Sequence, residues 1–475
     1  MRDWSVESVV IIGAARQGIA LARYLLEHGA RVLITDQRPL SELKTAQHSL
    51  ASSKNVGSLD WVCGGHPLTL LEGATLVCPS GGVPLDLPLI VEAKRRNIPL
   101  SNDSQIFLDV APCKVVGITG SAGKTTTTTL VGRMAQAAVG MHAGTAPYRE
   151  AWVGGNIGSP LISDLDNIRE DDLAVMELSS FQLEIMTSSP QIAAILNLTP
   201  NHLDRHGSMA AYTNAKAHIL AHQSPQDSAI LGRDDPGAWA LAGAVRGRLS
   251  SFGLSDLPEN DLGAFLHQQH ISLRTKGRSL GEKPLDRDVI DREDILLRGE
   301  HNLLNVMAAC TIAAVADLPD EAIKQGVNGF TGVPHRLEFV RSWGGADWYN
   351  DSIATAPERT MAAVRSFHEP LVLLVGGRDK DLPWEDLADL VQRRVDHLIV
   401  FGEAADRIMR SFAISADEKL SITRCKSLHE AVQAAAELAG PGDVVLLSPG
   451  GTSFDEFNDF EERGECFARW VRELR

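Results

Sequence analysis

The chain has 475 residues, of which 44% are hydrophobic and 22% charged, so it can bury sizeable cores and is predicted to form about three globular domains. Its formal net charge of −16 argues against general binding to nucleic acid or to an anionic membrane surface. The six cysteines lack metal-ligand spacing, and we find neither a signal peptide nor a membrane-spanning apolar run, so we expect a cytoplasmic protein with reduced thiols.

Apolar strands alternate with helical segments from one end of the chain to the other. The strand candidates are rich in Val, Ile and Leu, and they lie at 8–15, 30–36, 74–80, 113–120, 173–179, 192–199, 371–377, 397–402 and 443–449. Strands this continuously apolar are typical of parallel sheets that helices cover on both faces. The sequence therefore predicts an α/β fold.

Two breaks divide this pattern into segments. The alternation restarts after SNDSQIFLDVAPC (101–113), and glycine and proline punctuate GFTGVPHRLE (329–338). We therefore expect three domains, 1–110, 111–333 and 334–475, each with a mostly parallel sheet and helices on both faces. Residues 223–297 alternate clearly only around HISLRT (270–275), and we expect them to form a small appended sheet.

The first segment resembles a dinucleotide-binding fingerprint. Gly13 stands at the turn after the first strand, Gly18 where the helix packs, and Asp36 at the end of the next strand. Ala15 replaces the middle glycine, which hinders the close approach of a pyrophosphate. Three interpretations stay open here: a phosphate-containing nucleotide other than NAD, NAD itself, or a βαβ unit without a ligand.

Residues 115–130 (VVGITGSAGKTTTTTL) place a glycine-rich turn between a strand and a helix. The usual G-x-x-x-x-G-K-[ST] spacing asks for glycine at 118, where Ile118 stands. The parts that hold phosphate are nevertheless available: backbone N–H groups at the helix start, Lys124 for phosphate oxygens and the Thr125 hydroxyl for Mg²⁺. The threonines at 126–129 suit helix-start packing and capping, with direct nucleotide contact as the alternative.

Polar residues also follow two other strands of this predicted sheet. Glu177 ends the strand in LAVMELSSFQLE, and His202 follows the strand in IAAILNLTPNHLDRHG. Ligands of α/β sheets bind at the carboxyl ends of strands, so a Mg²⁺ site is one interpretation, and helix capping or simple packing is the other. Lys216 lies on the next predicted helix, which Ser208 could cap.

Taken in order, these motifs resemble those of the Mur ligases, most closely the MurD type. The shared motifs are GITGSAGKT, GGNIG, ELSSFQLE, LTPNHLDRH with a downstream lysine, GEHNLLN, PHRLE, NDSIAT, GGRDK and SPGGTSFDEFNDFEERG. The family's loop has the form G-x-x-G-x-x-G-K-[ST], which residues 117–125 fit. Two positions depart from the family: Ala122 stands where asparagine or lysine is common, and Ile353 stands where many MurD-type sequences have lysine.

The resemblance implies an ATP-dependent, C–N bond-forming ligase of peptidoglycan precursor synthesis that acts as a cytoplasmic monomer on small molecules. Its substrates would be UDP-N-acetylmuramoyl-L-alanine, glutamate (favouring the D enantiomer) and ATP with Mg²⁺, and the reaction would pass through an acyl phosphate. Three alternatives stay open: L-glutamate as the acceptor, a nicotinamide dehydrogenase suggested by the first loop, and a nucleotide-binding homologue without catalysis.

The resemblance also assigns residues to sites, position by position. The catalytic set is Lys124, Glu177, His202 and Lys216, and the Mg²⁺ ligands are Thr125, Glu177, His202 and Lys216 in a carbamylated form. ATP would contact Gly117, Gly120, Ser121, Ala122, Gly123, Lys124, Thr125, Thr126, Asn302, Asn305, Arg336 and Asp351. The UDP substrate would contact Arg16, Gln17, Asp36, Arg38, Gly82, Asn156 and His202. Glutamate would contact Lys380, Ser453 and Phe460.

Overall fold

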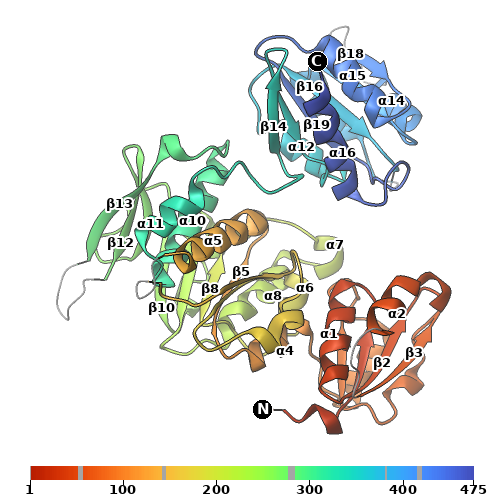
Figure 1. Ribbon diagram of the computed structural model, residues 1–475, viewed down its shortest axis with the longest axis vertical. Coiled ribbons are helices and arrows are strands. Elements are labelled where there is room, and N and C mark those ends of the chain that lie inside the picture. Colours follow the sequence, from red (N-terminus) through yellow and green to blue (C-terminus); the bar gives the residue numbers. More distant parts are fainter. Residues whose placement is uncertain (1, 52–56, 142–145, 277–283, 380–381, 414–419) are drawn as a thin grey trace. The chain divides into compact units, whose positions relative to one another are not determined.

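The computed structural model describes residues 2–51, 57–141, 146–276, 284–379, 382–413 and 420–475 (Figure 1). Its contacts divide the chain into two compact units. Unit 1 comprises Met1–Ile295 and Glu300–Phe330, and unit 2 comprises Leu296–Gly299 and Thr331–Arg475. In the described part of the chain, no helix combines the length and the apolar character that a membrane span requires.

Unit 1 begins with a four-stranded parallel sheet in the order β3-β2-β1-β4. Side chains of β1 alternate between two cores, because Val9 and Ile11 lie in one buried cluster and Val10 and Ile12 in another. The strands are β1 (Ser8–Ile12), β2 (Arg31–Asp36), β3 (Ser58–Cys63) and β4 (Leu76–Pro79), and the helices are α1 (Arg16–Glu27), α2 (Lys44–Ala51), α3 (Pro88–Arg95) and α4 (Asp103–Val110).

A second sheet of unit 1 has nine strands in the order β13-β12-β11-β10-β9-β8-β5-β7-β6. Its strands are β5 (Lys114–Thr119), β6 (Ala151–Gly155), β7 (Leu173–Glu177), β8 (Ile192–Ile195), β9 (Ser228–Gly232), β10 (Arg248–Gly253), β11 (Gly263–His267), β12 (His270–Thr275) and β13 (Leu285–Asp291). β5 lies between β7 and β8 and is parallel to both. β12 runs antiparallel to both of its neighbours.

Seven helices of the described chain accompany this sheet: α5 (Lys124–Val139), α6 (Ser180–Leu183), α7 (Leu203–His206), α8 (Met209–Ala221), α9 (Pro236–Trp239), α10 (Glu300–Val315) and α11 (Asp320–Val327). Short 3-10 helices in unit 1 are η1 (Trp4–Val6), η2 (Leu40–Glu42), η3 (Leu68–Leu71), η4 (Leu161–Asn167), η5 (Ala242–Ala244) and η6 (Arg292–Asp294). Residues 223–297 are richer in strands than predicted. These strands continue the β5 sheet instead of forming a separate one, because β9 pairs with β8.

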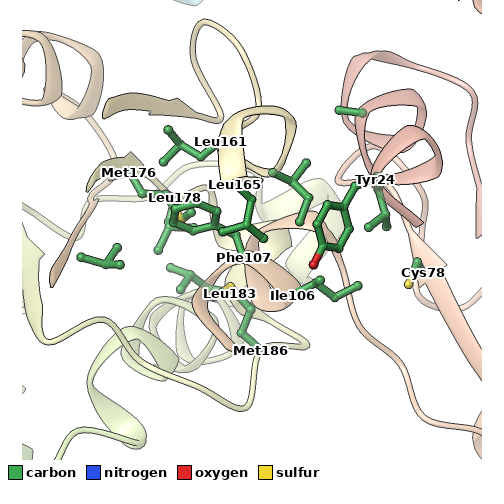
Figure 2. Close-up of a cluster of buried hydrophobic side chains, with 14 of the residues drawn as sticks. Tyr24, Cys78, Ile106, Phe107, Leu161, Leu165, Met176, Leu178, Leu183 and Met186 are labelled. Atoms are coloured by element: carbon green, nitrogen blue, oxygen red, sulfur yellow. The ribbon is translucent and has the colours of Figure 1, made fainter. Parts of the chain in front are cut away.

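One buried cluster runs through both sheets of unit 1. Figure 2 shows Tyr24 of α1, Ile106 and Phe107 of α4, Leu165 of η4 and Leu183 of α6 in this cluster. Polar groups add to the contact: Asn102 donates to the Gln182 carbonyl at 2.9 Å, and Gln182 donates to the Ser104 hydroxyl at 2.8 Å. The two sheets of unit 1 therefore share one buried hydrophobic cluster, to which α4 contributes Ile106 and Phe107.

Unit 2 holds a six-stranded sheet in the order β14-β15-β19-β16-β17-β18, in which only the β14–β15 pair is antiparallel. Separate buried clusters lie on its two faces. The strands are β14 (Glu338–Trp343), β15 (Ala346–Asn350), β16 (Leu371–Gly376), β17 (His397–Phe401), β18 (Ser421–Arg424) and β19 (Val444–Gly450). The helices are α12 (Pro357–Val364), α13 (Glu385–Arg394), α14 (Ala405–Ala413), α15 (Leu428–Leu438) and α16 (Phe460–Glu473). The predicted α/β class is confirmed.

Candidate functional site

The glycine-rich turn lies between β5 and α5, as the sequence predicts. Gly123 has φ +82° and forms the N-cap of α5, so Lys124 and Thr125 begin the helix. A Cβ on Gly123 would lie 2.1 Å from Asn305 Oδ1, so only glycine fits between the turn and α10. Gly117 lies within β5, while Gly120, Ser121 and Ala122 form the turn. Backbone N–H groups at such a helix start are suited to bind phosphate.

Asn197, which follows β8, fixes the turn from the side. Its amide accepts from the Ala122 N–H at 2.8 Å and donates to the Ala122 carbonyl at 3.1 Å. The Ser121 hydroxyl donates to the Thr199 carbonyl and accepts from Tyr212, at 2.9 and 3.0 Å. The turn is therefore held through the backbone of Ala122, whatever side chain stands there. Sequence reasoning missed Asn197 and Tyr212, whose only signal was their place in the motifs around His202 and Lys216.

Two lysines meet at the carbonyl of Gly120. Lys124 Nζ donates to it at 2.9 Å, and Lys216 Nζ, which is buried, donates to it at 2.9 Å and to the Thr119 hydroxyl at 3.1 Å. Burial and, secondarily, the Lys124 charge lower the pKa of Lys216 to about 6, against the opposing effect of Glu177. The structure thus brings both predicted catalytic lysines to one turn. Asn305 lies beside the same turn and donates to Asn302 at 3.1 Å.

Glu177 is the last residue of β7 and is only 1% exposed. Its Oε1 accepts from the Asn156 amide at 2.8 Å, whereas its Oε2 is buried and has no hydrogen-bond partner among the described residues. Such a buried oxygen is costly unless something binds it. The Asn156 carbonyl accepts in turn from Arg16 at 3.1 Å, which connects Glu177 to the first loop of the chain.

His202 is the N-cap residue of α7 in the loop that follows β8, and it is exposed. It has φ +52°, a conformation that is unfavourable for a residue with a side chain and that occurs often at functional sites. Its ring centroid lies 5.2 Å from that of Phe181. The described residues contain no group of three or more His, Cys, Asp and Glu side chains that could hold a metal.

Arg205 lies three residues after His202 and contacts the turn around Gly82, which follows β4 of the first sheet. Its guanidinium donates to the Gly82 carbonyl at 2.9 Å and to the Val83 carbonyl, and lies 4.2 Å from the centroid of the Phe181 ring. Sequence reasoning missed this residue. The His202 motif and the Gly82 turn are therefore in direct contact through one side chain.

Asp36 does not present a free carboxylate to a ligand. Its Oδ1 accepts from the Arg38 backbone and Nε, and its Oδ2 accepts from Arg38 Nη2 and the Ala14 N–H, at 2.8 to 3.0 Å. The Arg38 guanidinium, foremost among these partners, holds the pKa of Asp36 well below its usual range. Asp36 therefore orients Arg38 and the first loop.

A cavity of about 510 Å³ lies beside this pair and is lined by Arg16, Arg23 and Arg38, among others. Three arginines and one lining acid, Glu42, give it a positive character that suits a phosphate-containing ligand. Gln17 is not one of the residues that line this cavity. Its Oε1 lies close to Gly81, 3.5 Å from where a Cβ on that glycine would stand. Of the residues lining this cavity, sequence reasoning had selected Arg16 and Arg38 but not Arg23.

In unit 2, Arg336 stands between two residues with left-handed backbone, His335 (φ 64°) and Leu337 (φ 44°). Backbone strain of this kind is common where a side chain must be presented in one direction. The adjacent Asp351 is buried, and its Oδ2 accepts from the Ser448 hydroxyl at 2.8 Å. Burial raises the pKa of Asp351 to about 7, although Ser448 and Arg336 act in the opposite direction.

The predicted glutamate-binding residues lie in the same unit. The Phe460 ring makes an edge contact with His335 at 6.2 Å between centroids, and the Phe460 carbonyl accepts from the Ser352 hydroxyl at 2.8 Å. Ser453 is buried and starts the turn before α16. Lys380 lies outside the described residues.

A buried arginine that sequence reasoning missed, Arg463, joins these loops. It donates to the hydroxyl and carbonyl of Ser352 at 2.9 and 2.8 Å, and to the Gly451 carbonyl at 3.1 Å. Its completely buried guanidinium is thus satisfied by neutral acceptors from two loops. Arg463 therefore holds the NDSIAT and SPGGTS motifs together.

Comparison with known families accounts for this arrangement. Residues 7–102 match the Mur ligase MurD-like N-terminal domain, residues 118–313 the Mur ligase middle domain, and residues 335–451 the Mur ligase glutamate ligase domain. A protein of Symbiobacterium thermophilum named UDP-N-acetylmuramoylalanine–D-glutamate ligase is 39% identical over 468 residues, covering 98% of each chain. The chain belongs to the Mur ligase family.

Other relatives agree with the Mur ligase assignment. A protein of Acetivibrio thermocellus with the same name is 35% identical, covering 98% of this chain and 97% of the relative. Among solved structures, MurF from Acinetobacter baumannii has a TM-score of 0.56 at 17% identity, covering 98% of this chain and 93% of that one. The UDP-N-acetylmuramate-alanine ligase MurC from Thermotoga maritima has a TM-score of 0.55 at 17% identity, covering 98% and 100%. These two structures show that the Mur ligase fold extends over the whole chain.

Proposed function

We propose that this chain is the ligase that joins D-glutamate to UDP-N-acetylmuramoyl-L-alanine with the hydrolysis of ATP, a step of peptidoglycan precursor synthesis. The structural observation that carries the proposal is the convergence of Lys124, Lys216 and Glu177 Oε2, which has no hydrogen-bond partner in the described part of the chain, at the ends of the adjacent strands β5 and β7. Relatives that bear this activity in their names align along nearly the whole chain.

The reaction has two chemical steps. The terminal carboxylate of the UDP substrate attacks the γ-phosphorus of ATP, which forms an acyl phosphate and releases ADP. The amine of glutamate then attacks the acyl carbon, and the C–O bond to phosphate breaks as the amide forms and the amine loses its proton. Lys124 would bind phosphate oxygens and offset their charge, and Arg336 would supply a second cation for ATP.

The site residues fit a Mg²⁺ ion, because Glu177 Oε2 is a buried acceptor without a partner among the described residues. Glu177, His202 and the Thr125 hydroxyl would hold the ion, and Lys216 would take part as a carbamate, formed by reaction with CO₂. A Lys216 ammonium near Mg²⁺ would be repelled by about 1 to 4 kcal/mol at 4 Å for unit charges, whereas a carbamate reverses that sign. Bound there, the ion would neutralise the phosphate charge.

The remaining residues would bind the three substrates. Arg16, Gln17, Arg38, Gly82 and Asn156 would contact the UDP substrate, with Asp36 acting through Arg38. The turn 117–126, Asn302, Asn305 and Asp351 would contact ATP. Ser453, Phe460 and Lys380 would contact glutamate. Because ATP and UDP-linked precursors are cytoplasmic, we place the reaction in the cytoplasm, and we expect a monomer.

The test is phosphate release from ATP with purified protein and UDP-N-acetylmuramoyl-L-alanine, comparing D-glutamate, L-glutamate, lysine and diaminopimelate as acceptors. We expect release only when all three substrates are present and with D-glutamate preferred. Preference for L-glutamate would overturn the stereochemistry alone, preference for a diamine would overturn the acceptor assignment, and no release would indicate a homologue without catalysis.

Lys124→Ala supplies the residue-level control for this assay. It should abolish phosphate release without changing the thermal unfolding midpoint, because the side chain donates to the Gly120 and Ser121 carbonyls at the surface of the turn and serves phosphate charge. Lys324→Ala, an exposed lysine on α11 of the same unit, should behave as the wild type. A well-folded Lys124→Ala protein with wild-type turnover would contradict the assignment.

A further inference from the structure

Arg336 lies in a strained segment of unit 2. His335 has φ 64° and Leu337 has φ 44°, so both residues that flank Arg336 adopt the left-handed conformation. This conformation is unfavourable for any residue with a side chain, and it is rare for one as bulky as leucine. It persists only where surrounding contacts hold the backbone in place. The hydrogen bonds of residues 335–337 therefore identify what maintains the strain.

Glu338 holds the first of these left-handed residues. Its Oε2 accepts from the His335 backbone N–H at 2.8 Å and from the Asn350 side-chain amide at 3.0 Å. The same amide donates to His335 Nδ1 at 3.1 Å and to the Gly464 carbonyl at 3.2 Å. Asn350 is completely buried, so it offers a fixed anchor. One oxygen of Glu338 therefore connects the strained backbone at His335 to the interior of unit 2.

Two further bonds hold the backbone on either side of Arg336. The His335 carbonyl accepts from the Ile353 N–H at 3.1 Å. The Leu337 N–H donates to Asp351 Oδ1 at 3.3 Å. The Arg336 guanidinium, by contrast, makes no hydrogen bond in the part of the chain that the structure describes. The direction of this cation therefore depends on the backbone that carries it.

We infer that Glu338 is a positioning residue, which fixes the backbone at His335 so that the Arg336 side chain points in one direction. The inference rests on the proposed function, in which Arg336 supplies a cation for ATP. Without the carboxylate, His335 can rotate about φ toward the regions that residues with side chains prefer. Because φ is one of only two soft torsions per residue, this rotation would turn the chain that follows and displace Arg336. Glu338 thus acts on ATP through the backbone and not by contact.

The experiment measures kcat and the KM of each substrate in the wild type, Glu338→Ala, Glu338→Gln, Arg336→Ala and the double variant Arg336→Ala/Glu338→Ala. Glu430→Ala is the matched control, because Glu430 Oε2 accepts from the Lys426 N–H at 2.8 Å, which is the same kind of bond elsewhere in unit 2. Thermal unfolding of each variant checks that it is folded. Calorimetry with the non-hydrolysable analogue AMP-PNP repeats the comparison as a binding measurement, so that a variant with very slow turnover is still compared.

We expect Glu338→Ala to lower kcat/KM for ATP about 10- to 100-fold, and to change the KM of glutamate and of the UDP substrate less than about twofold. Glu338→Gln should keep most of the activity, because its amide oxygen can accept the same two hydrogen bonds. Once Arg336 is alanine, Glu338→Ala should cost less than about twofold more, since the two residues act as one unit. Losses that multiply in the double variant, equal rises in all KM values, an equal effect of Glu430→Ala, or a Glu338→Gln protein as impaired as Glu338→Ala would overturn the inference.

Failure of the proposed function can be told apart from failure of this inference. If the wild type neither releases phosphate nor binds AMP-PNP, the proposed function fails, and the backbone itself becomes the readout. Crystal structures of the wild type and Glu338→Ala should then show His335 in the left-handed region in the wild type alone, with the Arg336 Cβ displaced in the variant. An unchanged backbone at 335–337 in Glu338→Ala would refute the role of Glu338.

Discussion

Replacing Asp351 by asparagine is expected to stabilise unit 2 at and above neutral pH. Burial, the largest effect, raises the pKa of Asp351 from 3.8 to about 7. A carboxyl group whose pKa is higher in the folded than in the unfolded chain adds stability below the unfolded pKa and loses it as the pH rises through the folded pKa. Ionisation of Asp351 therefore destabilises the wild-type fold between about pH 4 and pH 7.

The size of the effect follows from the difference between the two pKa values. A pKa about 3 higher in the folded chain lowers the free energy of unfolding of the wild type by roughly 4 kcal/mol once the group is fully ionised. The stability advantage of Asp351→Asn over the wild type should therefore grow by about 2–3 kcal/mol between pH 5 and pH 8. Asparagine preserves the local hydrogen bonds, because its oxygen can accept from the Leu337 N–H while the Ser448 hydroxyl rotates to accept from its amide.

Urea unfolding of wild type and Asp351→Asn from pH 5 to pH 8 measures this difference. Amide hydrogen exchange in β15 and β19 establishes that the change lies in unit 2, since a chain with two units need not unfold in one transition. Asp389→Asn, at an exposed position of α13, is the control. Its free energy of unfolding should differ from that of the wild type by the same amount at every pH from 5 to 8. Parallel pH curves for wild type and Asp351→Asn, or a variant less stable at pH 8, would refute the reasoning.

Three further outcomes are expected. Lys216→Arg should be nearly inactive, because a guanidinium stays cationic and cannot form the carbamate, and ¹³C-bicarbonate should give an NMR carbamate signal in the wild type only; an active, unmodified wild type would contradict this. Arg205→Gln should raise the KM of the UDP substrate about tenfold and leave that of ATP unchanged, because its two bonds hold the Gly82 turn; equal rises would argue for a general structural role. Gly464→Ala should lower the free energy of unfolding by about 1–3 kcal/mol, since a Cβ there would lie 2.1 Å from His335 Nδ1, whereas Gly440→Ala meets nothing closer than 3.7 Å; equal stabilities measured by urea unfolding would count against the packing argument.

Local sequence alone determined the features that depend on neighbouring residues. The strand, the glycine turn and the helix around Lys124 form where the pattern predicts them. The reason is that the hydrophobic run, the turn residues and the start of the helix follow one another directly in the sequence. The predicted cap of α8 is confirmed: the Ser208 hydroxyl accepts from the Ala211 N–H at 3.2 Å. The alternation of apolar strands likewise sufficed for the α/β class.

Only the tertiary structure decided how distant segments meet. The bonds of Asn197 to Ala122, of Arg205 to Gly82 and of Arg463 to Ser352 join residues far apart in the sequence, and no local pattern marks the partner of a hydrogen bond. Asp36 illustrates the same limit, since its position at a strand end indicates a ligand contact while the fold commits both of its oxygens to Arg38 and Ala14. Hydrophobic periodicity fixes which side chains face inward, but the polar contacts that shape the site depend on which loops the packed sheets bring together.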